Sequence, residues 1–170
     1  MTTLATMAGA PATAEAVERY HQMVYAICLT HTRCRGDADD VFQEVFLAYH
    51  RKQPVCHDEE HRKAWLIRTT LNLARRAATG SWRARVVLGA TDEAGGDVFS
   101  FDVAEYDELF AALRGLPEAY RTVIHLFYFE DLPVTRIAAL LGQSEGAIKT
   151  RLSRGRTRLR EAMKEDSHVQ

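Results

Sequence analysis

The stretch that most constrains the fold of this chain covers residues 132–164, which predict two helices joined by a tight turn. In the first helix, apolar residues recur at helical spacing, and Pro133 stands where the first turn should begin. Gly142 is expected to end this helix, because glycine takes the left-handed backbone conformation that a tight turn needs. Ser144 and Glu145 then start the second helix. Its apolar stripe consists of Ile148, Leu152, Leu159 and Met163, with Gly155 where backbones could approach closely.

The other side of the second helix is polar and basic, and no acidic residue lies between Lys149 and Arg160. A short helix, a turn and a longer helix with a basic face can place the longer helix in the major groove of DNA. Lysine and arginine would hold phosphates, while Lys149, Thr150 and Arg154 could reach base edges. The alternative is an amphipathic surface helix with solvated arginines. The preceding helix and the glycine turn favour DNA binding.

The charges of the 170-residue chain lie in blocks, although its net charge is only −1. Every charged residue over residues 62–85 is basic, every one over residues 92–108 is acidic, and the C-terminal helix is basic again. Separate blocks of opposite sign indicate separate roles. The nearly neutral total predicts weak binding to random DNA, since that binding scales with the number of phosphates neutralised.

The N-terminal residues lack the features of a signal peptide, because no positive charge precedes their mild apolar patch. No run of apolar residues approaches the length needed to cross a bilayer. We therefore expect a disordered leader over residues 1–13, a cytoplasmic location and no membrane insertion.

The three cysteines, Cys28, Cys34 and Cys56, cannot all pair with one another and are expected to be reduced thiols. A zinc site could be drawn from Cys28, His31 and Cys34, or from Cys56 with His57. Cys28, however, falls on the apolar stripe of a predicted helix, and core packing explains it better. We expect no metal and no cofactor.

The N-terminal half predicts three helices, over about residues 14–32, 38–51 and 60–78. Asp37 is expected to cap the second helix, which would bury Val41, Phe42, Val45, Phe46 and Tyr49. Its polar side carries Asp40, Gln43 and Glu44. Taken alone, these residues would simply cap the helix and make its surface soluble. The third helix carries arginines interleaved with Trp65 and Asn72, a combination typical of single-strand recognition. We expect Trp65 to lie in the core. For Trp82, a core position and a role in single-strand recognition both stay open.

Residues 86–104 show scattered acids, several glycines and no helical period, which predicts a flexible linker. Two further helices, over about residues 105–113 and 117–129, precede the helix-turn-helix. The predicted fold is therefore all-α, with small helical domains at residues 14–85 and 105–166 joined by an acidic linker.

The order of these segments resembles the extracytoplasmic-function (ECF) sigma factors of the bacterial sigma-70 superfamily. Three stretches carry the resemblance: GDADDVFQEVFLAYHR, EEHRKAWLIRTTLNLARR and LRGLPEAYRTVIHLFYFEDLPVTRIAALLGQSEGAIKTRLSRGRTRLRE. They are similar to the family's polymerase-binding helix, its −10 helix and its C-terminal domain. The resemblance implies binding to core RNA polymerase and promoter DNA, and an anti-sigma factor that holds the free protein inactive.

The resemblance also assigns roles to residues. Asp40, Gln43 and Glu44 would face a coiled coil of the polymerase's largest subunit, and Asn72 would contact a flipped −10 base, in a pocket made by the loop at residues 56–62. Together with neighbouring basic and aromatic residues, the expected −10 contacts are Cys56, His57, Asp58, Arg62, Asn72, Arg75, Arg76, Trp82 and Arg83. The expected −35 contacts are Lys149, Thr150, Arg151, Arg154, Arg156 and Arg158.

Two departures from the family pattern concern specificity. The loop reads Cys56-His57-Asp58-Glu59-Glu60, where many members begin with a Phe-Arg-Gly type sequence, so their −10 preference does not transfer. Arg136 stands where many members have an acid.

The implied mechanism is binding and not catalysis, because no nucleophile–base pair, phosphate loop or metal spacing is visible. Extruding a −10 base would cost a few kcal/mol, which a fitted pocket would offset. One competing interpretation is a dimeric regulator that binds palindromic half-sites. Another is a zinc-dependent hydrolase, which only the scattered histidines support.

Overall fold

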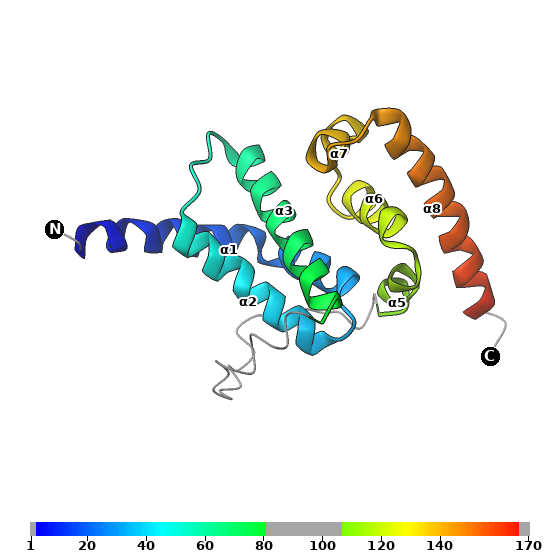
Figure 1. Ribbon diagram of the computed structural model, residues 1–170, viewed down its shortest axis with the longest axis horizontal. Coiled ribbons are helices and arrows are strands. Elements are labelled where there is room, and N and C mark those ends of the chain that lie inside the picture. Colours follow the sequence, from blue (N-terminus) through cyan, green and yellow to red (C-terminus); the bar gives the residue numbers. More distant parts are fainter. Residues whose placement is uncertain (1–2, 81–106, 167–170) are drawn as a thin grey trace. The chain divides into compact units, whose positions relative to one another are not determined.

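The computed structural model describes residues 3–80 and 107–166, and every regular element within these ranges is an α-helix (Figure 1). The chain divides into two compact units, Met1–Ser100 and Phe101–Gln170. The predicted all-α fold with a C-terminal helix-turn-helix is confirmed. Trp82, Arg83 and the expected linker lie outside the described residues, and the predicted domain boundaries stay predictions.

Unit 1 is built from three helices: α1 (Thr3–His31), α2 (Arg35–Lys52) and α3 (Glu59–Ala78). Each of them packs against the other two. The centre of the core consists of Val24, Ile27, Cys28, Val41, Val45, Leu66 and Ile67, all without exposed surface. The predicted core position of Cys28 is therefore confirmed.

Two helix starts differ from the sequence prediction. Helix α1 begins at Thr3, well before the start at about residue 14 that the sequence predicted, and its first turns contain several alanines together with Gly9 and Pro11. Helix α2 begins at Arg35, with Cys34 in the N-cap position and no side-chain cap. Asp37 lies inside the first turn of α2, where a carboxylate favours the positive helix end.

Helix α3 buries a broader face than one apolar stripe would give, because it packs on both α1 and α2. Ile67, Thr70 and Leu71 are buried together with Leu66, Ala74 and Ala77. Trp65 is half-buried, and its ring meets that of Tyr49 edge-on at 5.5 Å. Packing inside unit 1 is thus the observed role of Trp65.

Unit 2 contains α5 (Asp107–Gly115), α6 (Glu118–Tyr128), α7 (Val134–Leu141) and α8 (Glu145–Asp166). Helix α8 runs alongside the other three and organises the unit (Figure 1). It lies close to α6 at Gly155, where an added Cβ would lie 3.0 Å from Cγ1 of Ile124 and 3.3 Å from Cβ of Tyr120. The close approach expected at Gly155 is confirmed.

The turn between α7 and α8 forms as the sequence predicted. Gly142 adopts a left-handed conformation with φ of 63°, and its N–H donates to the carbonyl of Ala138. The Oγ of Ser144 accepts from the N–H of Ala147 at 3.2 Å, which caps the start of α8. These local contacts fix how α8 leaves the turn.

The core of unit 2 holds a histidine whose burial the sequence pattern did not predict. His125 has no exposed surface; its Nε2 lies 3.3 Å from a carboxylate oxygen of Glu130, and its ring stacks on Phe129. The pair ties α6 to the turn before α7. A histidine inside an apolar stretch gives no sign in the sequence that its partner lies five residues ahead.

Candidate nucleic-acid interface

Helix α8 presents a polar face that starts directly after the capped turn. Lys149, Thr150, Ser153, Arg154 and Thr157 are exposed there. The hydroxyl of Thr150 donates to the carbonyl of Gly146 at 3.0 Å, and that of Thr157 donates to the carbonyl of Ser153 at 3.2 Å. These bonds hold the side chains close to the helix, so Lys149 and Arg154 extend beyond them.

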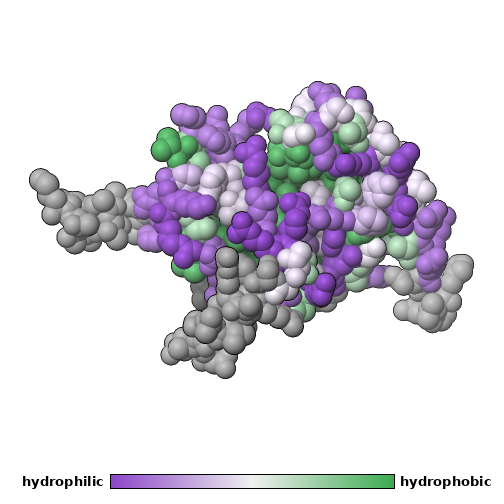
Figure 2. Space-filling model, viewed as in Figure 1, coloured by the Kyte–Doolittle hydropathy of each residue, from purple (hydrophilic) through white to green (hydrophobic). Residues whose placement is uncertain are grey.

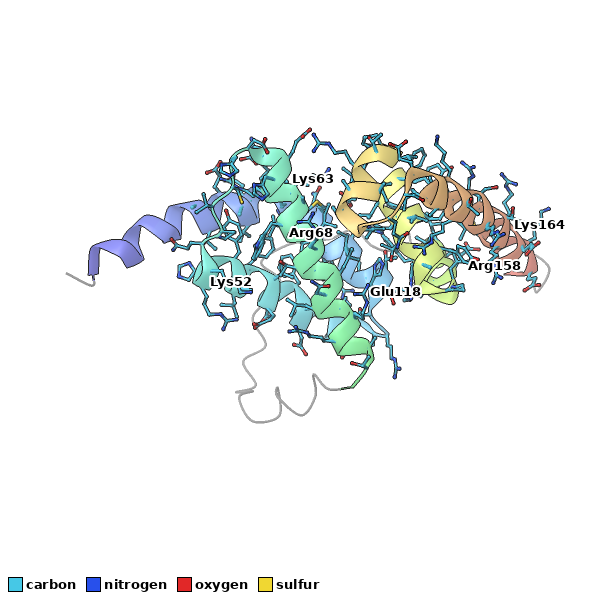
Figure 3. The ribbon with its side chains drawn as sticks, turned by 45° about the horizontal axis from the view of Figure 1, so that its top comes forward. Lys52, Lys63, Arg68, Glu118, Arg158 and Lys164 are labelled. Carbon is cyan, nitrogen blue, oxygen red and sulfur yellow. The ribbon has the colours of Figure 1, made fainter. Side chains whose placement is uncertain are left out.

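The other three arginines expected at this face make contacts inside unit 2. Arg151 donates to the side chain of Gln143 in the turn, and Arg156 donates to the hydroxyl of Tyr128 at 3.2 Å. The guanidinium of Arg158, labelled in Figure 3, lies 5.1 Å from the ring centre of Tyr120. The six expected residues therefore form two sets. Lys149, Thr150 and Arg154 form an outward set, and Arg151, Arg156 and Arg158 also pack on the turn and α6.

A shallow hollow of about 390 Å³ borders the outward set. Residues from α6 and the first half of α8 line it: Ala119, Tyr120, Gly146, Ala147, Thr150, Arg151 and Arg154. A Cβ at Gly146 would meet nothing within 4 Å, so the backbone there is open to a ligand. The face combines hydrogen-bond donors with an accessible backbone, which suits contact with a nucleic-acid duplex.

Helix α2 presents a face of a different character. Asp40 and Gln43 are exposed, while Glu44 is half-buried and forms an ion pair with Arg51. Desolvation raises the pKa of Asp40, and the nearby charges of Asp37 and Asp39 raise it further. This face therefore favours a cationic partner, which would relieve the crowding of carboxylates.

An apolar residue that sequence reasoning did not select lies on the same stripe. Leu47 is three and four residues beyond Glu44 and Gln43, and 51% of its surface is exposed. The signal was available, since Leu47 falls outside the apolar stripe of α2. An exposed leucine between polar residues is typical of a protein interface with an apolar centre.

The connection between α2 and α3 is a short loop, residues 53–58, held at both ends. Gln53 adopts a left-handed conformation with φ of 40°, and its N–H donates to the carbonyl of Tyr49 at 2.8 Å. At the other end, the carboxylate of Asp58 accepts from the N–H of His61 at 2.7 Å. The rings of His57 and His61 stack at 5.5 Å.

A cluster around Glu59 ties this loop to α1. The hydroxyl of Tyr20 donates to Oε2 of Glu59 at 2.6 Å, and Arg19 lies 2.9 Å from the same oxygen. Arg62 lies 2.9 Å from Oε1 of Glu59 and 3.6 Å from Glu15. We call these five residues the Glu59 cluster. Arg62, expected as a DNA contact, has a side chain only 18% exposed and belongs to this cluster.

The protonation of the cluster follows from these contacts. The hydrogen bond from Tyr20, and then that from Arg19, lowers the pKa of Glu59. Burial, followed by the hydrogen bond to Glu59, raises the pKa of Tyr20 to about 12. At neutral pH the carboxylate is ionised and the phenol is neutral, which is the state that the hydrogen bond requires.

The outer face of α3 carries three of the expected −10 contacts. Arg68, labelled in Figure 3, and Asn72, Arg75 and Arg76 are exposed along this helix. A hollow of about 250 Å³ opens at the loop end of the unit. Its lining residues are Ala12, Thr13, Tyr49, Gln53, Pro54, Val55, Cys56 and Arg62.

The cysteines do not form a common site. Cys28 is buried, Cys34 exposed and Cys56 half-buried, and burial raises the pKa of both Cys28 and Cys56. Among the residues that the structure describes, no three or more His, Cys, Asp and Glu side chains are grouped to hold a metal ion.

None of the described helices is both long and apolar enough to span a membrane.

Comparisons with known proteins agree with this arrangement. Residues 16–84 match Sigma-70 region 2, and residues 106–159 match Sigma-70, region 4. The ECF RNA polymerase sigma factor SigL of Mycobacterium tuberculosis is 31% identical over 163 residues, which cover 88% of this chain and 90% of SigL.

Two further matches differ in what they cover. The probable RNA polymerase sigma factor RfaY of Xanthomonas campestris is 30% identical over 146 residues, covering 81% of this chain but 36% of RfaY. The solved structure of the sigma factor RpoE in complex with the anti-sigma factor NepR, from Bartonella quintana, has a TM-score of 0.63 at 23% identity. That match covers 89% of this chain and 96% of RpoE, and it is a likeness of fold.

Proposed function

This chain belongs to the ECF sigma factors, RNA polymerase sigma factors for promoter-specific transcription initiation, and we propose that its two units divide promoter recognition between them. Unit 2, with its domain at residues 105–166, binds the −35 element as a duplex. Unit 1, with its domain at residues 14–85, binds core polymerase and the −10 element. The observation that carries the proposal is the exposed basic face of α8 behind a well-formed turn.

At the −35 element, the outward residues of α8 enter the major groove. Lys149, Thr150 and Arg154 contact base edges or phosphates, and Gly146 lets the backbone approach. Arg151, Arg156 and Arg158 brace α8 against the turn and α6 while their charge attracts phosphates. Within α8, one set of side chains thus reads the bases, and another set holds the helix in place.

At the −10 element, the exposed face of α3 follows the displaced strand. Asn72 contacts an extruded base, and Arg75 and Arg76 hold phosphates. Cys56, His57 and Asp58 form the adjacent loop, with Trp82 and Arg83 assigned to the same element. Arg62 acts indirectly, through the Glu59 cluster that holds the loop.

The acidic face of α2 binds core polymerase. Asp40, Gln43 and Glu44 supply its polar contacts, and Leu47 supplies an apolar centre. Rims of this kind, around a desolvated centre, are typical of protein interfaces. The proposed role is binding and not catalysis, in keeping with a family of initiation factors, and its proposed location is the cytoplasm.

An anti-sigma factor is proposed as the regulatory partner. The support is the family, together with a solved relative of similar fold whose complex contains one. Such a partner would occupy surfaces that polymerase otherwise binds.

Run-off transcription tests the proposal. Core polymerase with and without this protein is given a fragment carrying the upstream region of its own gene, and a defined new transcript is expected. Tight binding of the protein alone to that fragment, without a transcript, would instead favour a dimeric regulator.

A matched pair of variants tests the polymerase face. Asp40→Lys is expected to weaken core binding about tenfold or more, because it places a like charge against a cationic partner. Glu18→Lys makes the same change at an exposed site on α1 and is expected to leave binding unchanged. Equal behaviour of the two variants would contradict the assignment of α2.

A further inference from the structure

The turn between α7 and α8 carries a glutamine whose side chain is held by an arginine further along α8 (Figure 1). A guanidinium nitrogen of Arg151 donates to the side-chain oxygen of Gln143. The backbone of Gln143 is fixed as well, because its N–H donates to the carbonyl of Ala138 at 2.9 Å. Gln143 is not among the residues expected at DNA, yet both its backbone and its side chain have a set place in the turn.

Arg151 reaches the turn by lying back along α8. Side chains on a helix lean towards its N-terminus, and Ala147, one turn before Arg151, leaves room for the longer side chain. Gln143, Ala147, Arg151 and Arg154 follow one another at intervals of four, four and three residues, the spacing of one side of a helix. The last three of them line the hollow of about 390 Å³. Gln143 therefore lies at the start of the side on which α8 is proposed to meet DNA.

The bond from Arg151 decides which end of the Gln143 amide faces away from the helix. A guanidinium group has donors only, so the amide group that meets it is the oxygen and not the NH2. The NH2 group makes no hydrogen bond to a described residue, and it is not buried. The side chain of Gln143 thus offers N–H donors to a ligand from a fixed position.

A fixed pair of donors suits a phosphate better than a base. Glutamine reads adenine by donating and accepting along one edge of the amide, but the oxygen of Gln143 is turned towards Arg151. A phosphate oxygen needs donors alone. Because a recognition helix enters the major groove, the turn before it lies beside the sugar–phosphate backbone at the edge of the groove.

The charges around Gln143 also suit a phosphate. Arg151 lies against the amide, and Lys149 and Arg154 are exposed on the same helix. The acidic residue in the first turn of α8 is Glu145, which is two residues before Ala147 and therefore on the opposite side of the helix. In Figure 2, purple hydrophilic atoms follow the edge of unit 2 where Figure 1 draws α8.

We propose that Gln143 binds a backbone phosphate of the −35 element through its NH2 group, and that Arg151 holds the amide in the orientation this contact requires. The inference rests on the proposed binding of the −35 element by unit 2, and it adds a DNA-binding residue outside the recognition helix. The contact anchors the turn on the duplex, so that α8 enters the groove at one depth and its outward residues meet the same bases each time.

A carboxylate at this position separates DNA binding from mere support of Arg151. Gln143→Glu has nearly the same shape and accepts from Arg151 at least as well, but it has no N–H to donate and adds a negative charge. We expect the affinity of the holoenzyme for a duplex promoter fragment to fall about tenfold or more. Thermal unfolding of the full chain should be unchanged. If Gln143 only supported Arg151, binding would be unchanged as well.

Gln22→Glu is the matched control for the added charge. It makes the same substitution at an exposed site on α1 of unit 1. Its holoenzyme is expected to bind the promoter fragment within about twofold of wild type, because a single charge distant from DNA is screened by salt.

A second measurement locates the phosphate. Promoter fragments carry a single neutral methylphosphonate linkage at successive positions of the −35 element. At the phosphate that Gln143 contacts, this change should weaken wild-type binding about fivefold and leave binding of Gln143→Ala unchanged, because that variant has no donor to lose. The measurement compares two DNA fragments with one protein, so a loss of stability in Gln143→Ala does not affect it.

The proposal is overturned if Gln143→Glu binds as wild type does, if Gln22→Glu loses as much affinity, or if every methylphosphonate weakens wild type and Gln143→Ala equally. Scrambling the −35 sequence tests the premise separately. Unchanged wild-type binding to the scrambled fragment would overturn the proposed function of unit 2, and the phosphate contact with it.

Discussion

The loop between α2 and α3 and the helix α8 are proposed to meet the same polymer, yet they are built in different ways. Helix α8 carries its contacts on a regular face whose spacing is visible in the sequence. The loop carries its contacts on six residues, and its shape depends on α1 through Tyr20 and Glu59, which lie 39 positions apart. A regular helix suits the reading of an intact groove, whereas a braced irregular loop suits the holding of an extruded base.

The strongest way to break unit 2 alone is to fill the space at Gly155. Gly155→Val places side-chain atoms against Ile124 and Tyr120, where even a Cβ is tight. We expect the free energy of unfolding of unit 2 to fall by about 3 kcal/mol. Denaturant unfolding followed by circular dichroism checks this, and the −35 contacts should be lost together with the fold.

Gly146→Ala is the control for that change. It lies on the same helix, but its Cβ would meet nothing within 4 Å. Stability is expected to rise, by up to about 1 kcal/mol, because alanine is the better helix former. A similar loss of stability in both variants would mean that close packing at Gly155 is not the cause of the loss.

The second comparison separates base reading from support within α8. Arg154→Ala is expected to weaken binding to the −35 element by about 1–3 kcal/mol with little effect on unfolding. Arg158→Ala should weaken binding less and lower stability by about 0.5–1 kcal/mol, because Arg158 packs on Tyr120. Holoenzyme binding at several salt concentrations and thermal unfolding measure the two effects. The division fails if the variants are indistinguishable in both assays.

The third comparison loosens the loop without touching it. Tyr20→Phe removes the hydrogen bond to Glu59, and Tyr25→Phe removes a similar bond from Tyr25 to Asp39 of 2.7 Å. Each change should lower the free energy of unfolding by about 1 kcal/mol. Only Tyr20→Phe should also slow opening of a paired promoter, because only Tyr20 braces the loop. Equal transcription by the two variants would show that the Glu59 cluster has no part in opening.

A loss of stability at alkaline pH is also expected. Tyr20 and Tyr25 ionise in the folded protein only near a pKa of about 12, above the ordinary value of 10.0, chiefly because both are desolvated. The unfolded chain loses these protons first, so their stabilisation is complete below pH 10 and is lost as the pH rises towards 12. Tyrosinate absorbance and unfolding measured over this range should show it, with a shallower fall in Tyr20→Phe. Ionisation of both tyrosines near pH 10 in the folded protein would contradict the burial argument.

Much of unit 2 was predictable because its signals are local. The turn at Gly142, the helix start at Ser144 and Glu145 and the close approach at Gly155 were each expected and are each observed. A turn needs a residue that tolerates positive φ, and a helix start needs a side-chain acceptor, so the residue types themselves identify these places. His125 was not predicted, since its partner Glu130 approaches only when the turn after α6 closes.

In unit 1 the helices and the buried Cys28 were predicted, but the candidate site was not predicted in full. Arg62 was expected at DNA; the structure pairs it with Glu59 and with Glu15 of α1, and its contact with DNA stays a prediction. Leu47 and Val55, an exposed residue of the loop, were not singled out. Periodicity does place Leu47 outside the apolar stripe of α2, but it says nothing of Val55, because exposure of a loop residue depends on which tertiary neighbours cover it.

The sequence by itself determined the helical fold, the helix-turn-helix and the family, because helix periodicity, caps and turn residues act over a few positions. The tertiary structure alone decided which arginines of α8 point outward, how the loop after α2 is braced, and which apolar side chains remain uncovered. These features depend on contacts between residues far apart in the chain. Such contacts form only when the helices pack, since burial and charge pairing are properties of the assembled surface.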